Sequence, residues 1–435
     1  MSAEGAERLR VRHALPAVRW PTAEEAAGSR WFSPARLGRL PVAERTWVPA
    51  MVPWRATEDG LVTSEVLQWY ARFAEGQPGV LVVEATGIRD VASGPLLRIG
   101  DDRFVPGLRH LVDTVRERSG GRTRLLVQLI DFLAVRRRPE PEKFFLRFLE
   151  VDDAVRRRLA LASGEAGWLT APEPAVRTYL LGADRVVLDA ALTARQREAL
   201  DYGYRERVVD THLPWVRELP RTLPGLFAAA ADRARAAGFD GVEFHAGNGY
   251  LLDQFLRDGA NHRADAYGGS IENRARLALE SVDAVIGVWG PSRVGYKISP
   301  YFSNLGMSDS APIETFSYLA KELGSRRIAY LHIAEAVAGP AVARAGTLRA
   351  TPILRRLFGG PVIANGGYNL ESANAAIASN DVDLVAFGVP FLANPDLTER
   401  WKRGAPLNPP QFDLFYTGEE RGYTDYPTIE QQVTA

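Results

Sequence analysis

Eight short apolar segments alternate with amphipathic helical segments along most of this chain. The apolar segments are rich in Val, Ile and Leu and show no polar–apolar alternation, as in residues 79–88 (GVLVVEATGI) and 123–131 (TRLLVQLID). Continuous apolar strands of this kind are typical of parallel sheets buried on both faces. The remaining candidate strands are residues 45–51, 241–250, 293–300, 328–336, 361–367 and 382–390. Because eight strand–helix units fit a closed barrel better than an open sheet, the expected fold class is α/β, a (β/α)8 TIM barrel.

Residues 132–212 interrupt this alternation with charged helical segments. They follow the third strand, so we expect a large helical insertion in a loop at the carboxyl end of the barrel strands. Two interpretations stay open: a lid or specificity element over the barrel mouth, and an appendage that packs or makes oligomer contacts. Residues 1–30 are interpreted as an N-terminal extension, 31–428 as one barrel domain that contains the insertion, and 429–435 as a tail.

The composition disfavours or excludes several classes of protein. With 53 basic and 53 acidic residues the formal net charge is zero, which disfavours a nucleic-acid-binding protein. The absence of cysteine excludes disulfides, iron–sulfur clusters, thiolate zinc sites and a cysteine nucleophile, and we expect no metal site. No run of about 18 apolar residues and no signal peptide are visible, so we expect a cytoplasmic protein without a membrane partner.

The fourth candidate strand ends in side chains suited to catalysis. His245 lies at its carboxyl end, which faces the active site of a barrel, and Asn248 and Tyr250 follow within a few residues. Small residues between them allow a tight turn and the close approach of a flat ligand. An imidazole and a carboxamide three residues apart can donate to one oxygen and stabilise an oxyanion, and a nearby phenol can act as a general acid. A purely structural histidine is the alternative.

Residues 238–280 resemble the Old Yellow Enzyme family of FMN-dependent ene-reductases. That family carries H-x-x-[NH]-G-Y-L-x-x-Q-F-L, followed by N-x-R-x-D-x-Y-G-G-S-x-E-N-R. The first motif is matched by His245, Asn248, Gly249, Tyr250, Leu251, Gln254, Phe255 and Leu256. The second motif is matched by Asn261, Arg263, Asp265, Tyr267, Gly268, Gly269, Ser270, Glu272, Asn273 and Arg274. Shorter matches extend the resemblance over about residues 31–428, apart from the insertion.

The resemblance implies that FMN binds at the barrel mouth and that NAD(P)H is the hydride donor. The cofactor contacts that it implies on the first two strands are Pro49, Ala50, Met51 and Ala85. Gln128 would pair with the pyrimidine edge of the flavin, and Lys297 would place a cation near its N1/O2 edge. The phosphate would be held by a set of residues near the last two strands: Asn365, Gly366, Gly367, Gly388 and Val389.

The same resemblance implies a reaction. NAD(P)H reduces the flavin and leaves, and an enone-type small molecule takes its place. His245 and Asn248 hold the carbonyl oxygen, and Tyr416 in the C-terminal segment is a further substrate contact. Hydride reaches Cβ, and Tyr250 protonates Cα. A homo-oligomer is compatible with this sequence, which does not specify the substrate.

Four departures from the family pattern lie close to the expected site. Asp131 stands where the family has the His of Q-L-x-H-x-G-R, and Val52 stands where it often has Thr or Cys. Lys297 replaces an Arg, in a chain that is otherwise poor in lysine. Val389 replaces the Arg of F-G-R, which removes a phosphate clamp. These changes predict weaker FMN binding or a shifted redox potential.

Two alternative functions stay open at this point. The same site could run in reverse as a desaturase, or act as an isomerase without net redox chemistry. The altered residues could instead mark a barrel that no longer holds FMN and acts as a binder or an acid–base enzyme. A yellow colour of the purified protein would separate the flavoprotein from the last of these.

Overall fold

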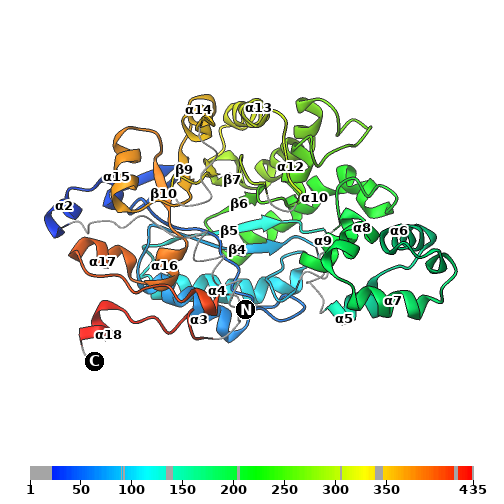
Figure 1. Ribbon diagram of the computed structural model, residues 1–435. Helices are drawn as coiled ribbons and strands as arrows, with labels where there is room; N and C mark the ends of the chain where they lie inside the picture. The colour runs from blue at the N-terminus through cyan, green and yellow to red at the C-terminus, as the bar shows by residue number, and fades with distance from the viewer. Residues whose placement is uncertain are drawn as a thin grey trace. The chain divides into compact units, whose positions relative to one another are not determined.

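Eight parallel strands close into a barrel at the centre of the protein (Figure 1). The computed structural model describes residues 22–89, 91, 94–133, 141–202, 206–303, 306–338, 346–415 and 420–433. Around the barrel the strands follow the order β10-β3-β4-β5-β6-β7-β8-β9. Their bounds are β3 (Thr46–Val48), β4 (Val80–Gly87), β5 (Arg124–Ile130), β6 (Gly241–His245), β7 (Val294–Ile298), β8 (Tyr330–Ala334), β9 (Val362–Asn365) and β10 (Leu384–Ala386). Each candidate strand of the sequence coincides with one of them, so the TIM barrel is confirmed.

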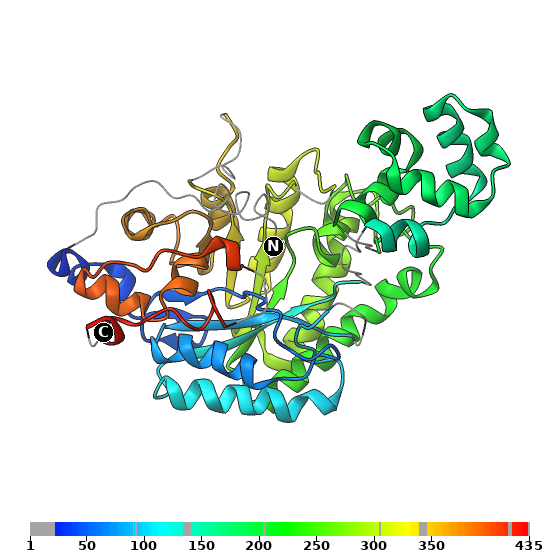
Figure 2. The same cartoon turned by 60° about the horizontal axis from the view of Figure 1, so that its bottom comes forward.

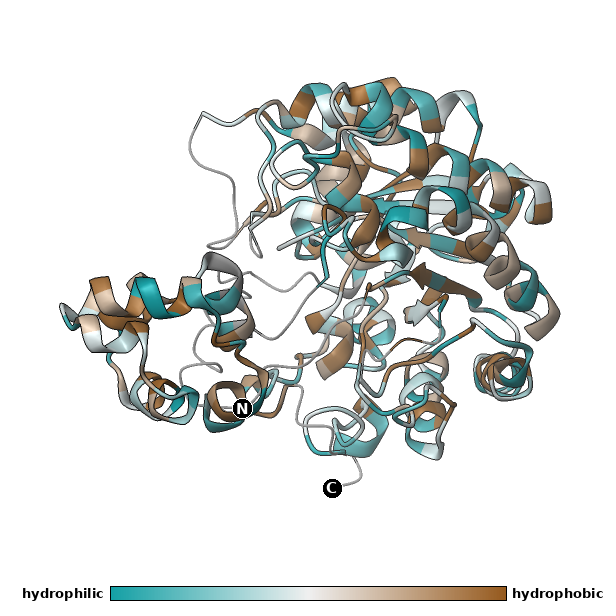
Figure 3. Ribbon diagram, turned by 90° about the vertical axis from the view of Figure 1, so that its right-hand side faces the viewer, coloured by the Kyte–Doolittle hydropathy of each residue, from teal (hydrophilic) through white to brown (hydrophobic). Residues whose placement is uncertain are grey.

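Helices surround the strands (Figure 2). In the hydropathy colouring of Figure 3 their ribbons alternate between teal and brown, as expected for helices with one face on the barrel and one in water. Their bounds are α3 (Ser64–Glu75), α4 (Val105–Arg118), α10 (Pro214–Ala237), α11 (Leu251–Leu256), α12 (Ile271–Trp289), α13 (Pro312–Ser325), α14 (Ala350–Phe358), α15 (Leu370–Ala378), α16 (Val389–Ala393), α17 (Leu397–Arg403) and α18 (Ile429–Val433). The periodicity of the sequence predicts seven of these, as amphipathic segments at residues 64–76, 107–121, 224–240, 271–290, 311–325, 347–360 and 369–381, which correspond to α3, α4, α10, α12, α13, α14 and α15.

The periodicity of the sequence predicts a helix that starts at Pro224, but α10 begins ten residues earlier, at Pro214. Its interior contains Pro220 and Pro224, which ordinarily end or kink a helix because each lacks an N–H. The residues upstream still contribute to the buried face of the helix, through Val216 and Leu219. Tertiary burial therefore outweighs the local preference for a break.

Two small elements before the barrel are absent from the sequence pattern. A hairpin of β1 (Ala35–Leu37) and β2 (Leu40–Val42) contributes Leu37, Leu40 and Val42 to the same core cluster as Trp47 of β3. A short helix, α2 (Ala23–Ala27), begins with a capping box and packs against α17. Elements of three to five residues carry too few side chains to show a period, which is why the sequence conceals them.

Residues Val91–Gly94 and Phe132–Arg207 form a second compact unit. It consists of short helices, teal to green in Figure 2, around a hydrophobic cluster of its own. The buried members of that cluster are Phe144, Phe145, Leu149, Val155, Leu159, Val176, Leu180, Ala191, Leu192 and Leu200. The helices are α5 (Pro141–Lys143), a π-helix (Phe144–Phe148), α6 (Asp153–Ser163), α7 (Glu173–Gly182), α8 (Arg185–Ala191) and α9 (Ala194–Tyr202). Whether the unit acts as a lid or as an oligomer contact stays a prediction.

The described residues contain no helix long and apolar enough to cross a membrane. They also contain no group of three or more His, Asp or Glu side chains arranged to hold a metal ion.

Glu84 is a fully buried carboxyl group in β4 whose charge the fold does not compensate. One of its oxygens accepts the N–H of Leu97 at 3.1 Å, and the other has no hydrogen-bond partner among the described residues. Burial raises the pKa of Glu84 from 4.5 to about 8, although the bond from Leu97 opposes this shift. Between these two values the folded protein keeps a proton that the unfolded chain releases. The native state therefore loses stability as the pH rises through this window.

We expect Glu84→Gln to stabilise the protein by an amount that grows with pH. The neutral amide removes the cost of keeping a carboxyl group protonated, which reaches roughly 5 kcal/mol at most for a shift of this size. The measurement is the difference in thermal unfolding midpoint between variant and wild type at about pH 5 and pH 8. An equal difference at both pH values would show that Glu84 is ionised in the fold.

Candidate active site

His245 is held as a neutral hydrogen-bond donor at the carboxyl end of β6. Its side chain is buried, and burial lowers the pKa of His245 from 6.5 to about 3, assisted by the charge of Lys297. The backbone N–H of Gly247 points at Nδ1 at 3.4 Å, so Nδ1 is the acceptor nitrogen. The proton is then on Nε2, because a neutral imidazole carries only one. The structure thus confirms the position of His245 at the strand end and assigns its tautomer.

Asn248 follows in a tight turn with left-handed backbone. Its φ is 56° and that of Gly249 is 74°. The Asn248 N–H donates to Oγ of Ser299 at 2.7 Å, which attaches the turn to the end of β7. A Cβ at residue 247 would lie 2.7 Å from the same Oγ, so Gly247 permits this close approach. Asn248 itself is half-buried and lies three residues after His245 in the chain.

Tyr250 lies beside the imidazole of His245. The two ring centroids are 5.0 Å apart and the ring planes are inclined by 65°. Tyr250 is also the residue from which α11 begins, so its backbone is fixed by the helix that follows. The structure therefore brings together the two aromatic members of the predicted trio, His245 and Tyr250, with Asn248 in the turn between them.

A layer of polar side chains lies inside the barrel below His245. Its centre is Glu243, which is fully buried. The carboxylate accepts three hydrogen bonds: from Nε2 of Gln128 at 2.6 Å, from the hydroxyl of Tyr330 at 3.1 Å and from Nδ1 of His332 at 2.9 Å. Burial alone would raise the pKa of Glu243, but His332, Lys297 and Gln128 outweigh it and hold the pKa below 4.5. Glu243 is therefore an ionised group that can only accept hydrogen bonds.

The charge of Glu243 decides which way the Gln128 amide faces. Because a carboxylate cannot donate, Gln128 must turn its NH2 group toward it, and Oε1 becomes the outward acceptor. Lys297 lies in register between His245 and His332 on β7. Burial lowers the pKa of Lys297, and Glu243 opposes this shift. An acceptor at Gln128 and a cationic donor at Lys297 match the N–H and carbonyl groups of a flavin pyrimidine edge.

The ends of β9 and β10 present unpartnered backbone amides. Within the described part of the chain, the N–H groups of Gly366, Gly367 and Tyr368 donate to no acceptor, and neither do those of Gly388 and Val389. The two strands are neighbours in the barrel. Successive free amides at adjacent strand ends are a typical binding site for a phosphate group. These residues fit the phosphate of FMN without an arginine at position 389.

Backbone geometry explains the two glycines of this loop. Gly366 and Gly367 have φ values of 129° and 73°. A Cβ at Gly366 would lie 2.6 Å from the carbonyl oxygen of Glu335, and one at Gly367 would lie 2.6 Å from that of Ala338. The loop after β8 therefore packs directly on the amide cluster and excludes any larger residue.

The other predicted cofactor contacts lie around the same mouth. Gly388 faces Met51 and Pro49, since a Cβ there would lie 3.5 Å from Sδ of Met51 and 3.8 Å from Cγ of Pro49. Asn365 ties β9 to β10 through Nδ2 and the carbonyl of Ala386 at 2.9 Å. Two further predicted contacts, Ala50 and Ala85, lie at the end of β3 and in β4. Tyr416 falls outside the described residues.

Asp131 makes an ion pair at the position where the family motif has a histidine. Its two carboxylate oxygens accept hydrogen bonds from Nε and Nη2 of Arg89 at 2.5 and 2.7 Å. The Asp131 side chain is fully buried. The pair joins the end of β5 to the segment after β4, and a two-point guanidinium–carboxylate contact fixes their relative orientation. Sequence reasoning noted the change at Asp131 but had no signal for its partner.

Three residues of the inner layer were missed by sequence reasoning: Glu243, Tyr330 and His332. All lie within strands, where they look like irregular polar interruptions of an apolar run. Their strand register was the only available signal, because Gln128 pairs with Glu243 and Lys297 pairs with His332 across neighbouring strands.

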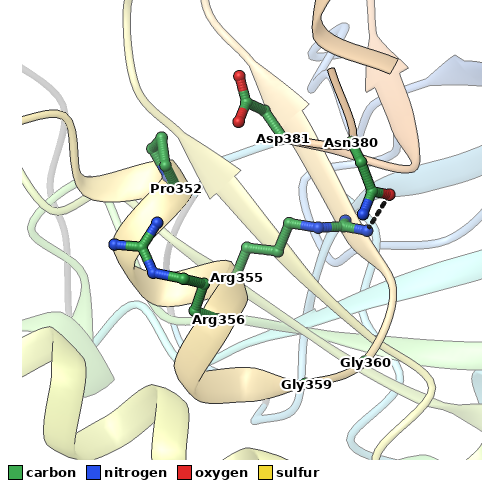
Figure 4. Close-up of a pocket in the computed structure, with 7 residues that line it drawn as sticks. All are labelled: Pro352, Arg355, Arg356, Gly359, Gly360, Asn380 and Asp381. Carbon is green, nitrogen blue, oxygen red and sulfur yellow. Dashed lines mark hydrogen bonds between the residues drawn. The ribbon is translucent and has the colours of Figure 1, made fainter. Parts of the chain in front are cut away.

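A surface pocket of about 370 Å³ lies away from these residues, between the end of α14 and the segment before β10 (Figure 4). Its residues Gly359 and Gly360 precede β9, and Asn380 and Asp381 precede β10, so it belongs to the amino-terminal face of the barrel. Arg355 spans it by binding Asn380 at 2.9 Å. This face of a TIM barrel serves stability and carries no catalytic groups in known enzymes of the fold.

Comparisons with known proteins agree with this geometry. Residues 223–408 match the model of the NADH:flavin oxidoreductase / NADH oxidase family. A putative 12-oxophytodienoate reductase 12 from Oryza sativa subsp. japonica is 46% identical over 223 residues, and the match spans 55% of that relative and 49% of this chain. The chain thus spans about half the length of several curated relatives that it matches.

Other relatives match over nearly their whole length. A putative 12-oxophytodienoate reductase 11 from the same plant is 32% identical across 98% of its length and 92% of this chain. The structure of morphinone reductase superposes with a TM-score of 0.69 at 31% identity, covering 93% of this chain and 97% of that one. An old yellow enzyme homologue from Zymomonas mobilis gives 0.69 at 30% identity, over 91% and 99%. The chain therefore belongs to the Old Yellow Enzyme family of flavin oxidoreductases.

Proposed function

We propose that the protein is an FMN-dependent ene-reductase, which reduces the activated C=C bond of an α,β-unsaturated carbonyl compound with NAD(P)H as hydride donor. The observation that carries the proposal is the neutral imidazole of His245, which carries its proton on Nε2. It lies at the carboxyl end of β6, with Asn248 in the turn that follows and Lys297 in register on the neighbouring strand. Relatives named as 12-oxophytodienoate reductase and morphinone reductase support the same class of reaction.

The cofactor proposal rests on the fit at both ends of FMN. The Gln128 amide oxygen and the Lys297 ammonium would hold the pyrimidine edge, and the amides near Gly366 and Gly388 would hold the phosphate. FMN, when bound, supplies the hydride transfer chemistry that no side chain can provide. The fit at both ends disfavours the alternative of a barrel that has lost FMN. No feature of the described residues favours a desaturase or an isomerase.

The catalytic side chains have two tasks: to stabilise the substrate carbonyl oxygen and to protonate the substrate carbon Cα. His245 and Asn248 donate to the substrate carbonyl oxygen, where negative charge develops, and each well-placed donor is worth roughly 3–4 kcal/mol. A neutral imidazole suits this task because it donates one hydrogen bond without carrying a charge into a buried site. Tyr250, next to the His245 ring, delivers the proton to Cα. Tyr416 as a substrate contact, a cytoplasmic location and a homo-oligomeric state remain proposals from the sequence.

We expect Tyr250→Phe to separate the two halves of the reaction. Flavin reduction by NAD(P)H needs no proton at substrate carbon, so its rate should stay nearly unchanged. Reoxidation by an enone should slow by about 10²- to 10⁴-fold, which is the usual contribution of a positioned acid. Stopped-flow absorbance of the two half-reactions measures both rates. Equal slowing of both, with flavin still bound, would refute the proton-donor assignment.

The pH dependence of reoxidation provides a test of the His245 assignment. Because its pKa is depressed to about 3, His245 stays neutral down to well below its ordinary value of 6.5. The pH profile of the reoxidation rate should therefore have no inflection near pH 6.5 that is due to His245. Wild type and His245→Asn should have profiles of the same shape in this range. The measurement is the rate of reoxidation by 2-cyclohexenone between about pH 5 and pH 8. An inflection that disappears in the variant would mean that the imidazolium takes part.

We expect Gly367→Asp to weaken FMN binding by at least about 100-fold. The new side chain would collide with the carbonyl of Ala338 and bring a negative charge to the amide cluster. Gly359→Asp is the matched control, since its φ of 69° is similar and no atom lies within 4 Å of its added Cβ. Fluorescence titration of apoprotein with FMN and with riboflavin measures the effect. Full flavin occupancy in Gly367→Asp would place the phosphate elsewhere.

A further inference from the structure

The turn that carries Asn248 and Tyr250 is held by side chains of the helix that follows it. The N–H of Gly249 donates to Oδ2 of Asp253 at 2.9 Å, and its carbonyl accepts Nε2 of Gln254 at 2.9 Å. Both polar groups of this one glycine are therefore fixed from α11. The sequence motif explains Gln254, but position 253 is one of its variable positions.

Asp253 is not an isolated carboxylate. Its other oxygen, Oδ1, binds Nε of Arg257 at 2.7 Å, and the two side chains are 0% and 2% exposed. Arg257 also donates to the carbonyl oxygens of Phe302, at 3.1 Å, and Ser299. Ser299 is the residue whose hydroxyl accepts the N–H of Asn248. A closed path of hydrogen bonds thus runs from the turn through Asp253 and Arg257 to the end of β7 and back to the turn.

The space around the turn leaves little freedom for another arrangement. A Cβ on Gly249 would lie 2.9 Å from Cγ of Met307 and 3.4 Å from the Phe302 ring. The turn therefore packs against the same segment to which Arg257 donates. A buried ion pair contributes little net stability compared with apolar residues, so its value here lies in the geometry it imposes.

We propose that Asp253 and Arg257 form a buried ionic brace that positions Asn248 and Tyr250 against the end of β7. Neither residue touches substrate or cofactor in this proposal, so both are positioning residues. The proposal rests on the ene-reductase function for its catalytic consequence. Its structural consequence, a rigid turn at Gly249, does not depend on the function.

The chain contains a matched control for this brace. Arg400 and Asp396 form a second pair with the same spacing of four residues, joined through Nε and Oδ1 at 2.8 Å; the arginine is fully buried and the carboxylate is 13% exposed. Arg400 also donates to backbone carbonyls, those of Pro406 and Pro427. Asp396 precedes α17 and Arg400 lies within it. Among the residues that the structure describes, neither side chain has a hydrogen bond to the catalytic turn. Any loss of stability or activity that comes only from replacing a buried arginine should therefore be the same whichever of the two pairs is changed.

The experiment compares Arg257→Lys with Arg400→Lys in the FMN-loaded protein. Lysine keeps the positive charge but cannot bind the carboxylate and two carbonyls in the same geometry. We expect both variants to lower the thermal midpoint and to retain FMN and normal reduction by NAD(P)H. Only Arg257→Lys should slow reoxidation by 2-cyclohexenone, by about 10- to 100-fold, because small displacements of catalytic groups have effects of that size. Only Arg257→Lys should accelerate hydrogen exchange of the Gly249 amide.

The outcomes separate the brace from the proposed function. If wild-type protein is not reoxidised by any enone, the function is wrong, and the exchange rate of Gly249 alone decides the brace. Equal exchange rates of this amide in the two variants, equal slowing of reoxidation, or loss of FMN only from Arg257→Lys would overturn the brace. Should Arg257→Lys fail to fold, Asp253→Asn against Asp396→Asn makes the same comparison with the same expected results.

Discussion

The buried carboxylate of Glu243 is the interaction on which the catalytic end of this barrel depends. An ionised group at full burial is stable only when donors surround it. Gln128 provides one from the neighbouring strand β5, and Tyr330 and His332 provide two more from β8, the next strand but one. Gly295 makes the arrangement possible, since a Cβ there would lie 2.0 Å from the Tyr330 ring. The carboxylate in turn orients the Gln128 amide and supports a cation at Lys297. The polar groups that the flavin edge would meet, the Gln128 amide and the Lys297 ammonium, are therefore controlled by a carboxylate that lies deeper in the barrel.

Three of the departures from the family pattern can be understood from the groups that surround the changed residues. Asp131 is not an uncompensated charge, because Arg89 binds both of its oxygens. Val389 removes a cation from the phosphate loop but leaves the backbone amides that would carry most of the recognition. Lys297 keeps a positive charge in register with His245. These three changes leave the groups that would hold the flavin in place, which agrees with retained flavin chemistry; the structure offers no explanation for Val52.

Rigid support of the catalytic turn is the second requirement of this site. Asn248 and Gly249 both adopt left-handed backbone, a conformation that asparagine and glycine tolerate better than other residues and that contacts around the turn stabilise further. Those contacts come from Ser299 on one side and from Asp253 on the other. The turn thus depends on residues from two other segments that pack against it, and only some of these residues belong to the recognisable motif.

The sequence by itself determined the barrel and most of its mouth. Apolar runs without alternation predict parallel strands. Eight such strands with helices between them predict a closed barrel, so the strands and principal helices followed from the residue pattern alone. His245, Asn248 and Tyr250 were identifiable because they lie within six residues of one another. Only the tertiary structure decided the partners of Glu243, Asp131 and Asp253. Hydrogen bonds between strands and loops depend on register and loop path, and neither leaves a periodic signal in the order of the residues.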